Sequence, residues 1–154
     1  MADEIPSPDV LASIPGGPEL LAWFGHVPRF HDAEIISLHL NRTGPSTLCI
    51  HTWDTTGTVD SKGFYIHEKD AVVTFTLEEI ENLELEGFSH QNVLGGLELN
   101  RIEAEASTSG RQGIRPDLYE IVLHPCYRLA GTIRARGVSL ALTPGKPIQV
   151  SSAS

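Results

Sequence analysis

Two spacings of apolar residues divide this chain and restrict it to a β-rich fold with one helix. Pro18 to Phe24 carries apolar residues at helical spacing with proline in the first turn, and Gly25 ends the segment. From residue 34 the period becomes two, which is typical of a β-strand. The apolar residues that this period places on one face are Ile36, Leu38 and Leu40.

About eight to ten short alternating segments follow, separated by turn-forming clusters such as Arg42–Ser46. Residues 55–63 and 107–113 lack apolar periodicity and are predicted loops. The apolar pattern changes parity near Asn100 and near Gly137, which predicts two bends in the sheet. We therefore predict a mostly β, single-domain fold: an antiparallel β-sandwich or open barrel (meander) with one short N-terminal helix.

The predicted domain organisation is simple. Residues 1–17 are expected to form an extended N-terminal arm over the surface, residues 18–143 a single β-rich domain, and residues 144–154 a C-terminal tail. The total length of 154 residues suits one domain that buries most of the surface exposed by its unfolded chain.

The compartment follows from cysteine usage and hydropathy. Cys49 and Cys126 are too few for a disulfide scaffold and favour a reducing compartment. The first residues lack the basic and apolar regions of a secretory signal, and no apolar run approaches the roughly 20 residues that cross a bilayer. We expect a cytoplasmic protein with no membrane partner.

Acidic side chains are concentrated in the first two thirds of the chain. Residues 1–105 contain 18 acidic and 5 basic side chains, whereas residues 106–154 contain 2 and 6. This balance disfavours nucleic acid as a direct partner and fits either a basic protein or a purely solubilising role. Between Glu78 and Glu105, eight acidic residues accompany one basic residue. On the outer face of two neighbouring strands they would form a patch for a cationic protein, with Glu84 and Glu86 as candidate contacts.

His31 and Asp32 lie together just before the first strand. Such a pair can perform acid–base chemistry, bind a metal, or cap loop backbone groups. We expect the capping role, with Asp32 accepting hydrogen bonds. A second polar cluster precedes the diglycine at residues 95–96 and either organises a loop or presents a binding surface. The further candidate binding residues are Glu34 and the cluster His90, Gln91 and Asn92.

His39, Cys49 and His51 would share one face of a hairpin of matched register. Two histidines and a thiol have the composition of a zinc site, but a closed site needs a fourth ligand and supporting hydrogen bonds. We expect ordinary sheet residues here and no metal. The chain also lacks HExxH, GxSxG, P-loop and GxGxxG motifs, so no catalytic residue and no cofactor is predicted.

The chain contains the segments WFG, FHDAEI, IISLHLNR, LCIHTWDTT, VVTFTLEEIENLELEGFSHQNVLGGLEL and YEIVLHPCY. Together, from about Leu20 to Thr143, they resemble the immunity protein 50 family of bacterial polymorphic toxin systems. The resemblance is densest at residues 30–34, 86–92 and 125–127. It implies a small intracellular protein that binds and neutralises a cognate toxin. The alternatives are a hydrolase or small-molecule-binding domain with a polar pocket around His31, Asp32 and His90, and a binding module of another kind.

Overall fold

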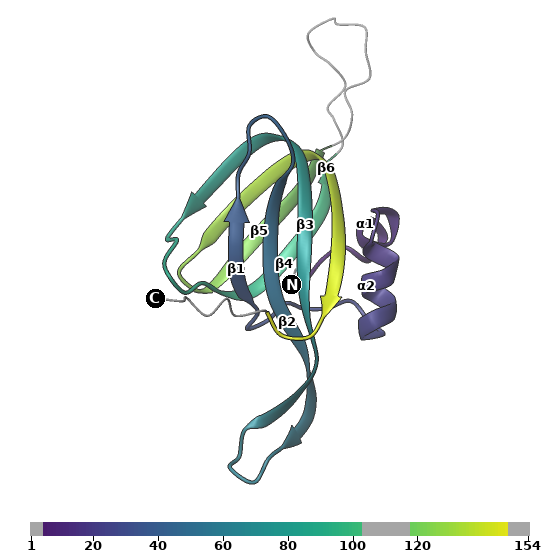
Figure 1. The fold of residues 1–154 in the computed structure, drawn as a ribbon, viewed down its shortest axis with the longest axis vertical. Coiled ribbons are helices and arrows are strands. Elements are labelled where there is room, and N and C mark those ends of the chain that lie inside the picture. Colours follow the sequence, from purple (N-terminus) through teal and green to yellow (C-terminus); the bar gives the residue numbers. More distant parts are fainter. Residues whose placement is uncertain (1–4, 103–117, 148–154) are drawn as a thin grey trace, which may run out of the picture.

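The computed structural model describes residues 5–102 and 118–147, which form an antiparallel barrel with two short helices beside it (Figure 1). The helices are α1 (Pro8–Ser13) and α2 (Gly17–Phe24). The strands are β1 (Glu34–His39), β2 (Ser46–Val59), β3 (Tyr65–Glu86), β4 (Val93–Ile102), β5 (Leu118–Tyr127) and β6 (Ala130–Pro144). They neighbour one another in the order β1-β2-β3-β6-β5-β4, and the pairing of Glu34 with Val93 closes the barrel. The predicted mostly β, antiparallel fold is confirmed.

The described strands are fewer and longer than the predicted short segments. β3 runs unbroken for 22 residues through what the sequence suggested were separate strands. β6 likewise continues across Gly137, where the predicted parity change is confirmed: Ala135 and Val138 are both buried. Opposite this point β3 has Glu79 at φ 52°. Near Gly137 the sheet therefore bends by local irregularities within continuous strands, which agrees with the bulge and not with the tight turn that the parity change also allowed.

The bend predicted near Asn100 is wrong. β4 pairs with β5 without a break from Gly96 to Ile102, and its register shifts lie at Leu94 and Gly96. Ile102, Ala104 and Ala106 suggested the parity change. Ile102 lies at the end of the strand, where an apolar side chain need not face the core, and the two alanines lie outside the described residues. The residues after it, including the predicted loop at 107–113, lie outside the described part of the chain.

The predicted extended arm is also wrong, because residues 8–13 form α1. Ser7 caps this helix by accepting a hydrogen bond from the N–H of Val10, and a proline occupies the first turn. Leu11 and Ile14 are buried in the core. The helix has 6 residues, too few for its apolar spacing to be recognised in the sequence.

α2 matches the predicted helix, and Gly25 ends it in the left-handed conformation with its N–H donating to Leu21 C=O. The two helices pack against β6 and β4, where Leu140 N–H donates to Pro15 C=O at 2.9 Å. Of the predicted C-terminal tail, residue 144 still belongs to β6 and residues 148–154 lie outside the described ranges. In the described residues no helix has the length and apolarity needed to cross a membrane.

The interior is filled by alternate side chains of the strands and by apolar residues of the helices. The largest fully buried side chains are Phe30, Phe75, Leu11, Ile14, Leu20, Leu48, Ile50, Leu77, Leu94, Leu97, Leu99 and Ile121. The predicted apolar face of β1 is wrong in part, because a register shift between Ile35 and Ser37 buries Ile35 and exposes Ile36. β2 and β3 also extend beyond the barrel as a two-stranded arm, so residues 55–59 are strand where a loop was predicted (Figure 1).

Candidate binding surface

One end of the barrel gathers the starts of β1 and β4, the end of β3 and the turn between β5 and β6. Glu34 pairs with Val93, and Val93 pairs with Tyr127. A Cβ atom built on Gly87 would lie 2.6 Å from the carbonyl oxygen of Arg128, so the loop after β3 touches the turn after β5. We call residues 30–34, 84–94 and 125–130 the loop end. In Figure 1 the end of β3 and the turn between β5 and β6 lie on the left side of the barrel.

His31 and Asp32 lie at the loop end. The hydrogen bonds that hold this loop are made by backbone groups, although the sequence predicted that the Asp32 carboxylate would accept them. The Asp32 N–H donates to Leu94 C=O at 2.8 Å, and the Leu94 N–H donates to Ala33 C=O at 2.8 Å. Within the described residues the Asp32 carboxylate meets only the His31 ring, with Oδ2 3.2 Å from Nδ1. The predicted capping by the Asp32 side chain is therefore wrong. The two side chains are 66% and 57% exposed, which is the opposite of a closed catalytic pocket.

The cluster at residues 90–92 divides into one structural and two exposed residues. Asn92 is buried: its Oδ1 accepts from Ser89 N–H at 2.9 Å and its Nδ2 donates to Ser89 C=O at 2.8 Å. Its own C=O accepts from the Ile35 N–H, which fixes the loop against β1. Asn92 thus shapes the loop, whereas His90 and Gln91 face solvent.

The acidic residues are arranged differently from the predicted patch on two neighbouring strands. β3 and β4 are separated by β6 and β5, and Glu98 of β4 is hydrogen-bonded to His124. On the barrel wall Glu81 pairs with Arg136, and Glu120 pairs with Arg134 at 2.9 Å. For the described residues the patch across two neighbouring strands is therefore wrong, because topology separates β3 from β4 and arginines of β6 occupy the wall between them. Glu103 and Glu105 of the predicted patch lie outside the described ranges.

Two of the predicted carboxylates remain exposed at the loop end without such partners. Glu84 and Glu86 lie opposite Thr132 and Ala130 of β6, and neither forms an ion pair with any described residue. Glu34 is half-buried and belongs to the same end through its pairing with Val93. The loop end therefore carries unpaired negative charge.

Two exposed aromatic residues that the sequence reasoning missed also lie at the loop end. Phe88 is 67% exposed and Tyr127 is 45% exposed. Phe88 also lines a hollow of about 350 Å³ with the apolar side chains of Leu38, Leu85 and Leu129. Exposed aromatic side chains beside an apolar hollow are typical of protein-binding surfaces. Strand periodicity does not single out Phe88, which lies in a loop, or Tyr127, which is the last residue of β5, although both belong to segments where the family resemblance is densest.

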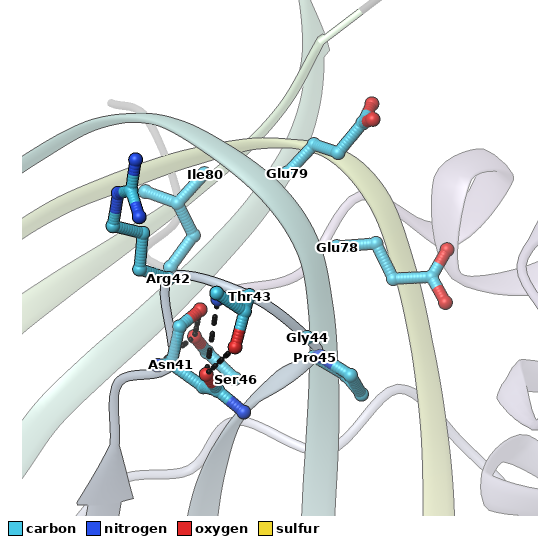
Figure 2. A pocket seen from close by; sticks show the side chains of 9 residues that line it. All are labelled: Asn41, Arg42, Thr43, Gly44, Pro45, Ser46, Glu78, Glu79 and Ile80. Atoms are coloured by element: carbon cyan, nitrogen blue, oxygen red, sulfur yellow. Dashed lines mark hydrogen bonds between the residues drawn. The ribbon is translucent and has the colours of Figure 1, made fainter.

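A larger hollow of about 660 Å³ lies between the turn after β1 and the middle of β3 (Figure 2). The turn satisfies its own polar groups, because Asn41 Oδ1 accepts hydrogen bonds from Thr43 N–H and Thr43 Oγ1. In Figure 2, Glu78 and Glu79 point away from this turn. The hollow therefore presents few converging polar groups, and we do not assign a ligand to it.

The predicted face of His39, Cys49 and His51 lies outside the barrel and forms separate contacts. Cys49 Sγ lies 3.4 Å from Thr74 Oγ1, and His51 Nε2 lies 2.9 Å from Asp70 Oδ1. In the described ranges no three His, Cys, Asp or Glu side chains are grouped so that they could hold a metal ion.

Comparison with known proteins links the chain to one family. The model of a family described as Immunity protein 50 matches residues 18–113, more than half of the chain. The matched span contains β1 to β4 with the loop at residues 87–92, and it ends before β5. No curated protein and no solved structure matches the chain.

Proposed function

The chain belongs to the immunity protein 50 family, and from this premise we propose that it binds and neutralises a cognate toxin domain in the bacterial cytoplasm. It acts by stoichiometric protein–protein binding without turnover. The toxin belongs to a polymorphic toxin system, and its contact surface is basic.

The observation that carries this proposal is the composition of the loop end. Exposed Phe88 and Tyr127 lie at the same end of the barrel as Glu84 and Glu86, which have no cationic partner among the described residues. Aromatic anchors surrounded by charged residues fit a protein interface, in which the aromatic rings supply binding energy and the charges steer the partner. His31, Asp32, His90 and Gln91 would lie at the rim of this interface, with Asn92 holding the loop in place.

The test is complex formation with the toxin domains encoded beside this gene. We expect a one-to-one complex in calorimetry and loss of toxin activity at equimolar ratio. Phe88→Ala should weaken binding by about 30-fold or more, as removal of a central aromatic anchor does. Phe64→Ala is the matched control, because Phe64 is equally exposed at 67% but lies on the arm outside the barrel. If the two variants bind the toxin with equal affinity, the interface does not lie at the loop end.

A further inference from the structure

The outer half of β3, residues 78–86, is an edge of the barrel wall. β2 pairs with β3 only as far as Ser46 opposite Leu77, whereas β6 pairs with β3 up to Ala130 opposite Glu86. In the described part of the chain no strand pairs with the outer half on the side opposite β6. Figure 1 shows this half as the left margin of the barrel. Such an edge presents backbone donors and acceptors to a further strand.

The backbone geometry indicates which groups point outward. A Cβ atom built on Gly131 of β6 would lie 2.0 Å from the carbonyl oxygen of Glu84, so this carbonyl is directed at β6. In an antiparallel ladder the N–H and C=O of one residue point to the same side, and those of its neighbours point to the other. The N–H and C=O groups of Leu83 and Leu85 therefore point to the free side.

The side chains along this edge present two different environments. Leu85 lines the apolar hollow together with Leu38, Phe88 and Leu129. Glu84 and Glu86 are exposed on the outer face, and residues 78–86 contain five glutamates and no basic residue. An added strand would direct alternate side chains into the hollow and toward the carboxylates.

We propose that the outer half of β3 accepts an extended basic segment of the toxin as an added strand. Backbone hydrogen bonds form with Leu83 and Leu85, apolar side chains enter the hollow, and Lys or Arg side chains lie beside Glu84 and Glu86. The inference rests on the proposed function and names the chemistry of its partner. A second copy of this chain is disfavoured as the occupant, because edge-to-edge pairing would place glutamates opposite glutamates.

The first test uses a peptide of alternating lysine and valine as a model strand. Amide hydrogen exchange should slow by about tenfold at Leu83 and Leu85 and remain unchanged at Glu84, whose N–H is directed at β6. A peptide of alternating glutamate and valine is the control and should give no protection. Slower exchange with both peptides would overturn the inference, and so would unchanged exchange at residues 81–86 with both. Self-association of the chain that the lysine peptide blocks would also overturn it.

The second test uses the toxin and separates the backbone from the side chain at one position. Leu85→Pro removes a free-side N–H, and Leu85→Ala removes the apolar side chain but keeps that N–H. We expect Leu85→Pro to bind about tenfold more weakly than Leu85→Ala, with both variants folded by circular dichroism.

These results distinguish the two proposals. Suppose that Leu85→Pro and Leu85→Ala bind the toxin equally well, while Phe88→Ala still weakens the complex. The added-strand inference would then be wrong, and the proposed function would still hold. If no toxin binds the wild-type chain, the proposed function fails, and the peptide experiment still decides whether this edge accepts a basic strand.

Discussion

Individual residues shape the loop end through backbone conformations that few side chains adopt. Phe30 and Asp32 have φ values of 57° and 66°. The Phe30 ring is nevertheless only 2% exposed and lies 6.2 Å from the Phe75 ring, so core packing offsets the cost of its left-handed conformation. Asp32 has no such packing, but aspartate tolerates this conformation better than most residues do.

This backbone role leads to a prediction for Asp32. Asp32→Ala should lower the free energy of unfolding by about 1 kcal/mol, because alanine is strained at positive φ. Asp32→Gly should retain wild-type stability, since glycine adopts this conformation freely and keeps the N–H bonded to Leu94. Urea denaturation of both variants is the measurement. If the glycine variant is as unstable as the alanine variant, the carboxylate itself stabilises the loop and the backbone explanation is wrong.

His26 gives the fold a pH-dependent contact between the end of α2 and β2. Its Nε2 lies 2.9 Å from Asp54 Oδ2, and its Nδ1 lies 3.0 Å from Val27 C=O. The hydrogen bond to Asp54, followed by that to the Val27 backbone, raises the pKa of His26 above its ordinary value of 6.5. A raised folded-state pKa stabilises the fold fully below the unfolded-state pKa, and this contribution disappears as the pH rises through the folded-state pKa.

We therefore expect His26→Ala to lose more stability at about pH 5.5 than at about pH 8.5. The difference should remain below about 1 kcal/mol, because the His26 side chain is 50% exposed and its ion pair is screened by water. Denaturation at the two pH values measures it, and in an Asp54→Asn background the difference should shrink. An equal loss at both pH values would show that the ring contributes only by packing.

At the scale of elements, strand periodicity predicted where β-structure occurs but not how long each strand is. The parity change at Gly137 suggested a bend or break, yet β6 continues through this glycine because its whole length, from Ala130 to Pro144, pairs with residues 71–86 of β3. Tertiary pairing overrides a weak local signal in this way. α1 was missed for the related reason that its 6 residues are stabilised by burial of Leu11 and not by a visible pattern.

The same limit applies to the candidate site. Residues 30–34 and 90–92 stood out in the sequence because they combine polar side chains with strand boundaries, and the structure brings both segments to one end of the barrel. Phe88 and Tyr127 did not stand out as candidates. Their exposure depends on turns whose positions are set by long-range pairing, such as that of Val93 with Tyr127.

At the scale of the whole molecule, the strand order of the barrel determines which carboxylates are free to contact a partner protein. The chain has 20 acidic and 11 basic side chains, but Arg134 and Arg136 of β6 lie between the carboxylates of neighbouring strands. The wall is thereby partly neutralised, whereas Glu84 and Glu86 at the loop end have no cationic partner among the described residues. Strand order is not visible in the sequence, so this separation could not be predicted from it.

A basic toxin should be attracted to the loop end before any close contact forms. The double variant Glu84→Lys with Glu86→Lys should therefore slow association by about tenfold at low salt and weaken its salt dependence. The fold should persist, because exposed charges contribute little to stability. The matched control is Glu19→Lys with Glu68→Lys, which changes the net charge equally at exposed positions on α2 and on the arm. Stopped-flow association rates at low and high salt provide the measurement. Equal slowing by both pairs would mean that overall charge steers the toxin, and unchanged rates for the first pair would place the interface away from these carboxylates.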